Sequence, residues 1–326
     1  MSVSAGRNRK IFAVIAVAIV AVISGIVVGK LYINMSFVPP IIAGKASDYR
    51  DSASDVEALY VRSTKGASAD AFNAVELFEI AEYRLNHANA YYRDMNGNVV
   101  ASAPIIGSIN QVQSTQRYFK DGVIVVKKGS PSSNAMAPAV KFRMVYDTNT
   151  KKVQLNQSGS FTKKSLPVKF DCDESANEVY DEQDYINKYY VQAGSDVPVI
   201  DSLTETTLPY VVSKMTCGPN DYTAVKNNHD GTYSFTINMS GDDLNRAGVV
   251  YAREINISAN VATFVTWISL TMTVTVDSNY NFKSISYQEV YKMRHNSTGA
   301  PSTVTNNFVD NFYFDEASIP AIEEVL

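Results

Sequence analysis

Residues 263–276, TFVTWISLTMTVTV, decide the fold, because apolar and polar side chains alternate along them with a period of two. Alternation sustained over about ten residues is typical of a β-strand with one buried face and one solvated face. The side chains that this pattern places on the buried face are Ile268, Leu270, Met272, Val274 and Val276.

The same pattern returns after a predicted turn at residues 277–281, DSNYN. Residues 282–294 repeat the alternation, and the apolar side chains on one face of this second strand are Ile285, Tyr287, Tyr291 and Met293. An isolated hairpin is marginal in water, so further strands and a covering layer must bury this face. We therefore expect an α+β fold in which helices cover a large antiparallel β-sheet.

Composition agrees with a folded, sheet-rich chain. Of 326 residues, 45% are hydrophobic and 11% aromatic, which excludes a disordered protein, and the 20 tyrosines favour strands. The formal net charge is −4, and without the first 33 residues, which hold four basic residues and no acid, it is −8. A nucleic-acid partner is therefore not expected, because phosphate binding needs a concentrated basic face.

The N-terminal segment predicts a membrane anchor. Residues 11–29, IFAVIAVAIVAVISGIVVG, carry no charge, and about 20 apolar residues in a helix span a hydrocarbon core of about 30 Å. Arg7, Arg9 and Lys10 precede this run, so the positive-inside rule places the N-terminus in the cytoplasm. A cleaved signal peptide is the alternative, although its apolar region is usually shorter. Either interpretation makes the rest of the chain extracytoplasmic.

The domain organisation follows from these segments: a cytoplasmic tail at 1–10, a transmembrane signal anchor at 11–33, a tether at 34–67 and an extracytoplasmic α+β domain at 68–326. Within the domain we expect a helix over 68–87 capped by Ser68, and hairpin turns at Asn96-Gly97 and Asp121-Gly122. Further helices are expected over 181–190 and from Ser240 to about Arg253, and a last strand over 303–314.

This order of elements resembles the bacterial envelope proteins grouped with LolA, LolB and LppX. The resemblance covers residues 68–316 and depends on the opening helix before the hairpins, the helix near 241–253 and the threonine-rich final hairpin. It implies a large, strongly curved antiparallel sheet, a half-barrel, whose hollow is covered by helices and holds acyl chains. The predicted anchor departs from these proteins, which carry a cleaved signal or a lipid-bearing cysteine.

The two cysteines, Cys172 and Cys217, predict a disulfide, because an even number in an oxidising compartment usually pairs. Two separate thiols remain the alternative. The three histidines at 87, 229 and 295 form no motif for zinc or catalysis, and no nucleotide-binding loop is present. We therefore expect no enzyme activity, no cofactor and no metal, although the acidic run 171–184 could bind calcium.

Five aromatic residues on the predicted sheet are candidates for lining an apolar ligand cavity: Phe235, Phe264, Trp267, Tyr287 and Tyr291. A long curved sheet leaves a hollow that helices or a ligand must fill. The sequence thus predicts a membrane-anchored binding module with a hydrophobic groove for a lipid or a lipidated partner. The alternatives are an interaction protein of the cell envelope with a fully packed core, and an extracytoplasmic hydrolase that uses one of the histidines.

Overall fold

A single antiparallel sheet of eleven strands forms the centre of the computed structural model, which describes residues 44–103, 107–130, 139–160, 174–191, 196–259, 265–294 and 301–321. The strand order is β6-β5-β4-β3-β2-β1-β11-β10-β9-β8-β7, so the first and last strands of the meander pair in the middle. The strands are β1 (Ala90–Ala103), β2 (Gly107–Lys120), β3 (Val123–Ser130), β4 (Ala139–Asp147), β5 (Lys152–Ser160), β6 (Glu174–Asp181), β7 (Lys226–Asn227), β8 (Thr232–Ser240), β9 (Thr266–Asp277), β10 (Phe282–Arg294) and β11 (Pro301–Tyr313).

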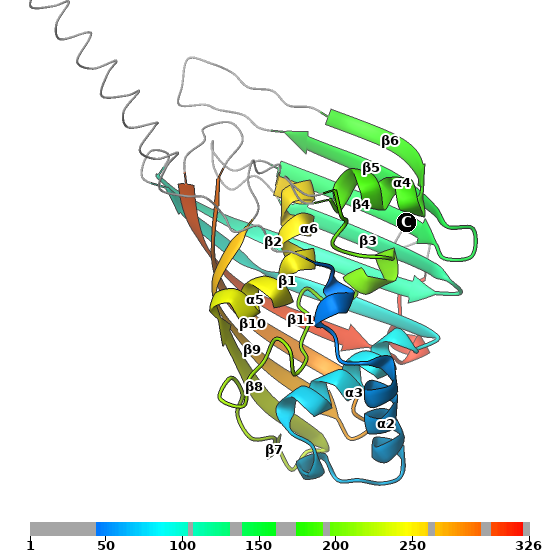
Figure 1. The fold of residues 1–326 in the computed structure, drawn as a ribbon. Coiled ribbons are helices and arrows are strands. Elements are labelled where there is room, and N and C mark those ends of the chain that lie inside the picture. Colours follow the sequence, from blue (N-terminus) through cyan, green and yellow to red (C-terminus); the bar gives the residue numbers. More distant parts are fainter. Residues whose placement is uncertain are drawn as a thin grey trace, which may run out of the picture.

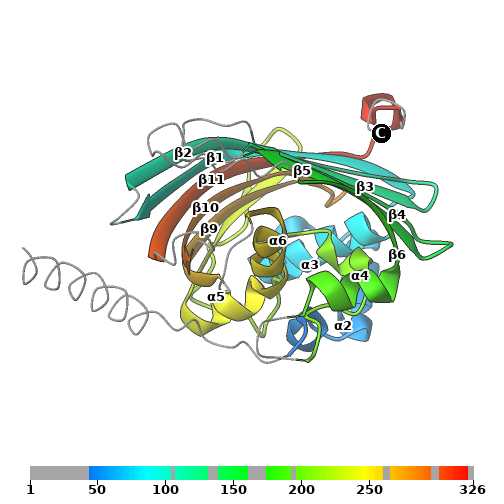
Figure 2. The same cartoon turned by 90° about the horizontal axis from the view of Figure 1, so that it is seen from above.

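The sheet is strongly curved, and the described α-helices lie on its concave face (Figures 1 and 2). They are α2 (Ala53–Thr64), α3 (Ala74–Asn86), α4 (Glu182–Tyr189), α5 (Gly241–Ala247) and α6 (Val249–Ala259). Short 3-10 helices occur at η1 (Ala46–Tyr49), η2 (Ala69–Ala71), η3 (Leu203–Thr206) and η4 (Glu316–Ser318). The segment around η4 lies on the convex side, where Ile319 packs against buried Tyr118 and Val125. The predicted α+β class with a curved antiparallel sheet is confirmed.

The hairpin of β9 and β10 forms as predicted, but one of its inward positions was wrong. Leu270, Met272, Val274 and Val276 are buried, whereas Ile268 is 39% exposed. The pairing shifts between Val290 and Tyr291, which oppose Ser269 and Trp267 and leave Ile268 in a bulge. Because a bulge moves the alternation by one residue, the Trp267 side chain takes the inward place that strict alternation gives to Ile268.

The turn predicted at Asn96-Gly97 is also wrong, because both residues lie in the middle of the 14-residue strand β1. Gly97 pairs with Phe308 of β11, and a Cβ at this glycine would overlap the carbonyl oxygen of Asn307 and the Phe308 ring. Here glycine permits close packing between strands and does not mark a reversal.

The Asp121-Gly122 turn is confirmed between β2 and β3, and both residues have positive φ, at 51° and 77°. The opening helix begins later than predicted. Asn73, not Ser68, is the N-cap of α3: its side chain accepts from the backbone N–H of Glu76, whose carboxylate accepts from the Asn73 N–H, both at 3.0 Å. The helix predicted from Ser240 is divided at Gly248 into α5 and α6. The predicted helix over 181–190 and the last strand are confirmed as α4 and β11.

The predicted anchor and the first part of the predicted tether precede residue 44, where the described residues begin. The predicted anchor at 11–33 lies outside the described residues, and none of the described helices is long and apolar enough to cross a membrane. From residue 44 the predicted tether contains η1 and α2, and α2 packs against α3.

Candidate functional site

Three of the predicted ligand-lining aromatics meet in one cluster. The Trp267 ring lies 4.9 Å from Tyr291 and 5.2 Å from Tyr210, and Tyr210 lies 6.1 Å from Tyr287. Tyr251 of α6 stacks on Trp267 at 5.4 Å. Tyr210 comes from the segment between α4 and β7, which includes η3 and which we call the connector. The cluster therefore joins the sheet, α6 and this connector.

The remaining predicted residues lie elsewhere. Phe235 is buried in the core on β8, and Phe264 lies outside the described residues. The Trp267 indole is fully bonded within the protein, since its Nε1 donates to the Gly248 carbonyl oxygen over 3.1 Å and its ring is stacked. None of the four described aromatics, Phe235, Trp267, Tyr287 and Tyr291, lines either of the two pockets described below, so the role of the five as ligand contacts stays a prediction.

Two adjoining pockets lie in what we call the α6 seam, between the concave face of β1–β4 and the layer formed by α6 with Tyr190, Thr206 and Pro209. Their volumes are about 20 and 30 Å³, each enough for one or two water molecules. Val126, Lys128, Thr206 and Glu254 line both pockets. One pocket is completed by Phe142, Met144 and Tyr190, and the other by Arg93, Met95, Thr115, Arg117, Pro209 and Tyr251.

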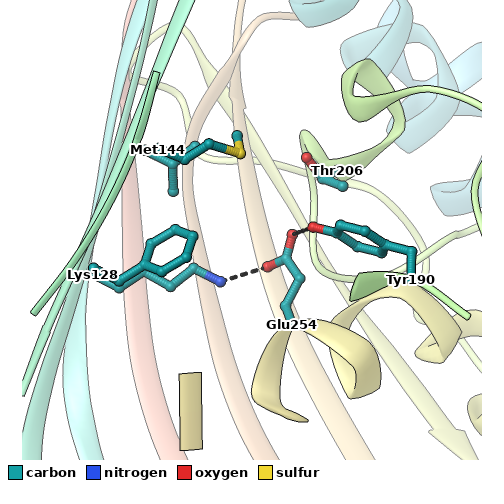
Figure 3. A pocket seen from close by; sticks show the side chains of 7 residues that line it. Lys128, Met144, Tyr190, Thr206 and Glu254 are labelled. Atoms are coloured by element: carbon teal, nitrogen blue, oxygen red, sulfur yellow. Dashed lines mark hydrogen bonds and ion pairs between the residues drawn. The ribbon is translucent and has the colours of Figure 1, made fainter. Parts of the chain in front are cut away.

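A charged contact links the two sides of the α6 seam (Figure 3). Lys128 Nζ on β3 donates to Glu254 Oε2 on α6 over 2.8 Å, and the Tyr190 hydroxyl donates to Glu254 Oε1 over 3.5 Å. Both charged side chains are 18% exposed, so the pair lies near the surface. Phe142 and Met144 lie beside it on β4, which gives the seam an apolar wall and a polar edge.

Two arginines lie directly opposite each other deeper in the α6 seam. Arg93 of β1 and Arg117 of β2 are cross-strand partners, and they are 5% and 3% exposed. Arg93 Nε donates to Asp310 Oδ2 over 2.5 Å, and its Nη1 donates to the Thr207 carbonyl oxygen. Arg117 donates from Nε to the Tyr91 hydroxyl over 2.9 Å and from Nη1 to the Thr206 carbonyl oxygen over 3.2 Å. Like charges at directly opposed strand positions are unfavourable.

A buried carboxylate lies beside the aromatic cluster. Glu289 is 1% exposed, and its Oε2 accepts from Asn306 Nδ2 over 2.9 Å. Burial raises the pKa of Glu289 to about 7 and that of Asp310 to about 6, although Arg93 favours the ionised form of Asp310. Desolvation thus outweighs the neighbouring positive charge at Asp310.

These charged residues could have been found from the sequence. Glu289 falls between Tyr287 and Tyr291 on the predicted apolar face of β10, and Arg93 and Arg117 also fall at inward positions of their strands. A charged residue within an otherwise apolar period is costly unless it is paired or functional. The pairing between Arg93 and Arg117 could not be found, because it depends on the registers of β1 and β2.

The cysteine and histidine predictions have separate outcomes. Cys217 is buried, and burial raises the pKa of its thiol to about 12. Cys172 lies outside the described residues, so the disulfide stays a prediction. His87 and His229 are exposed, the first beside Tyr83 and the second at a turn with φ of 61°, while His295 is outside the described residues. Neither described histidine lines the α6 seam.

Comparison with known proteins gives matches among solved structures. No family model and no curated protein sequence matches the chain. The solved structures do include the LolA superfamily. A LolA superfamily protein from Nitrosomonas europaea is 8% identical, with 77% of this chain and 99% of that chain covered and a TM-score of 0.21. A Vibrio parahaemolyticus domain described as an outer membrane lipoprotein-sorting protein is 8% identical, with 77% and 95% covered and a TM-score of 0.26.

A third structure, a protein from M. tuberculosis, is 7% identical, with 70% of this chain and 94% of that chain covered and a TM-score of 0.19. The resemblance stated from the order of elements is therefore also found among solved structures. At these identities and TM-scores the likeness carries no argument about ligand or location. Those questions depend on the residues of this chain.

Proposed function

We propose that this domain is an extracytoplasmic binding module that holds the apolar chain of a lipid or a lipidated partner in the α6 seam. In this proposal residues 11–33 anchor the module at the cell membrane. The observation that carries it is the composition of the seam. Val126, Phe142 and Met144 form an apolar wall on the sheet, and the polar groups gather at the edge and at one end. Ligand sites commonly combine apolar walls with a few convergent polar groups.

Binding requires the seam to widen. Pockets of about 20 and 30 Å³ are far smaller than the roughly 300–1,000 Å³ of ordinary ligand sites, so α6 must move away from the sheet. The bond between Lys128 and Glu254 is one contact that opposes this movement. Because both side chains are partly exposed, water can reach their charges when the bond opens.

The same small volumes favour a second candidate function. If α6 stays on the sheet, the core is fully packed, and the molecule is an interaction protein of the cell envelope that uses its outer surface. The buried cluster of Trp267, Tyr210 and Tyr291 has the close ring contacts expected of such a core.

Fluorescence from the one tryptophan of the chain can distinguish the two functions. Trp267 stacks on Tyr251, which lines the seam, so energy transfer from Trp267 reports a polyene chain bound there. We would hold the full chain in a tryptophan-free amphipathic polymer and titrate it with the methyl ester of parinaric acid, an uncharged apolar probe. Saturable transfer supports the binding module.

The variant Glu254→Gln weakens the contact across the seam, so we expect it to bind the ester several-fold more tightly than the natural chain. Glu57→Gln is the matched control, because Glu57 is an exposed acid on α2, outside the seam. Absence of transfer in the natural chain and in Glu254→Gln would favour the packed-core function instead.

A further inference from the structure

Arg117 is a buried cation without an acidic partner. It is 3% exposed, and its Nη2 has no hydrogen-bond partner among the described residues. Its other nitrogens donate to neutral oxygens, those of Tyr91 and Thr206. No carboxylate pairs with it in the described part of the chain. A buried charge is strongly unfavourable unless it is both paired and hydrogen-bonded, so this guanidinium lacks the partner that such a position requires.

Two further cations lie near Arg117, and each of them has an acid of its own. Arg93 lies directly opposite on β1, and Lys128 of β3 is paired with Thr115, two residues before Arg117 on β2. Arg93 has Asp310 as its partner and Lys128 has Glu254, so each acid is already engaged by one cation. All three cations line the same pocket of the α6 seam. The pocket therefore has one positive charge more than the acids bonded to these cations neutralise.

The unpaired nitrogen belongs to a pocket-lining side chain. A water molecule in the pocket of about 30 Å³ would satisfy the Nη2 hydrogen but would leave the charge without a counter-ion. A compact anion would do both, since a guanidinium binds a carboxylate with two parallel N–H···O bonds when two of its nitrogens are free to turn toward it. The apolar wall of Val126, Phe142 and Met144 begins beside this position.

We propose that Arg117 binds the anionic group of an amphiphile, a carboxylate carried on an acyl chain, with the chain lying along the α6 seam. Arg93 and Lys128 keep their own acids, so the carboxylate neutralises Arg117, and Thr206 moves with the connector to release Arg117 Nη1 for the second bond. This inference deepens the proposed function and rests on it, because the chain needs the widened seam. It specifies a ligand with a free acid at its polar end and not an esterified one.

The test compares parinaric acid with its methyl ester, in the full chain held in the tryptophan-free polymer at pH 8, with empty polymer as the blank. The two probes share one chain and differ in charge. We expect the acid to bind at least about tenfold more tightly, the ratio that corresponds to about 1.4 kcal/mol. Equal binding of acid and ester would overturn the anion site while leaving the proposed function in place. Binding of neither would overturn both.

Two variants test whether Arg117 causes the preference for the acid over the ester. Arg117→Met should bring the ratio of acid to ester affinity close to one, while Lys127→Met should keep the natural ratio, because Lys127 is the adjacent cation of β3 on the opposite face of the sheet. A tenfold ratio that persists in Arg117→Met would overturn the assignment. If Arg117→Met does not fold, the ratio in the natural chain still decides whether the anion is bound.

Inorganic phosphate separates an amphiphile from a free anion. We would add phosphate up to millimolar concentrations to the complex with parinaric acid and use the same ionic strength of sodium chloride as the control. No displacement beyond that of sodium chloride supports an amphiphile. Displacement by phosphate alone at concentrations similar to those of the acid would show a free-anion site and overturn the proposal.

Discussion

The indole of Trp267 lies against Gly248, the residue that separates α5 from α6, and donates its Nε1–H to the Gly248 carbonyl oxygen over 3.1 Å. A Cβ at position 248 would overlap the indole ring. This contact fixes where α6 begins above the sheet. It also explains why the helix predicted from Ser240 is divided into α5 and α6. The chain passes the Trp267 ring at position 248, where only glycine leaves room for the ring.

Gly248→Ala should therefore destabilise the domain by about 1–3 kcal/mol, the usual cost of overpacking a core. Gly129→Ala is the matched control: a Cβ there would lie 3.4 Å from Ser114 Oγ, an ordinary contact, and neither glycine has a positive φ. Urea unfolding followed by Trp267 fluorescence measures both. Equal stabilities of the two variants would show that the Gly248 contact is easily relieved.

Gly97→Ala tests the close approach between β1 and β11. The added methyl group would meet the backbone oxygen of Asn307, which cannot move without disturbing the ladder, so we expect a loss of about 2 kcal/mol or more. Hydrogen exchange should show the loss of protection concentrated on β1 and β11. An unchanged exchange pattern would show that β1 and β11 accommodate the methyl group, which would contradict the close contact at Gly97.

Asp310→Asn should cost about 3–5 kcal/mol, because it leaves Arg93 as a buried cation without its partner, opposite Arg117. The control is Glu178→Gln, which removes a bond between Glu178 and Lys188 whose side chains are 42% and 48% exposed. An exposed pair contributes about 1 kcal/mol or less. Chemical unfolding of both variants gives the comparison, and similar losses would contradict the interpretation that Asp310 neutralises Arg93.

Period-two alternation predicted most of the sheet, because one face of each strand is buried by the helices. It was wrong at Ile268 because a bulge depends on the register between β9 and β10, which one strand alone does not specify. The turn predicted from Asn96-Gly97 was wrong for a related reason. Glycine marks both turns and close strand contacts, and the choice depends on the partner strand.

The candidate site was less predictable than the fold. Trp267 packs against Tyr210, Tyr251 and Tyr291, and Tyr287 packs against Tyr210, while the predicted role of these residues in lining a ligand cavity stays a prediction. Tyr210 comes from a segment without regular structure and Tyr251 from a helix, so the sequence could not show these contacts. The α6 seam depends on the same distant segments, and its charged residues were visible only as exceptions to the apolar pattern.

The stability of the domain should depend on pH through Glu79 of α3. Glu79 is 4% exposed, and burial together with the neighbouring carboxylate of Asp51 raises its pKa to about 8, from 4.5. The positive charge of Lys214, which pairs with Asp51 over 3.4 Å, opposes this rise in the pKa of Glu79. The carboxylate of Glu82 adds to the rise, and Arg50 pairs with Glu82 over 2.9 Å. Between these two pKa values the folded domain binds more protons than the unfolded chain. The free energy of unfolding therefore falls as the pH rises from about 4.5 to about 8.

Glu289 and Asp310 also make the free energy of unfolding fall as the pH rises, because burial raises their pKa values. These values are about 7 and about 6, so their effect is complete at a lower pH than that of Glu79. Glu79→Gln keeps a neutral side chain at all pH values, so we expect this variant to become more stable than the natural domain as the pH rises from 7 to 8.5. At pH 4 the two should be similar. Glu57→Gln, at an exposed position on α2, should follow the natural domain throughout. Thermal unfolding across this range measures the difference, and parallel curves for Glu79→Gln and the natural domain would show that Glu79 is ionised in the fold.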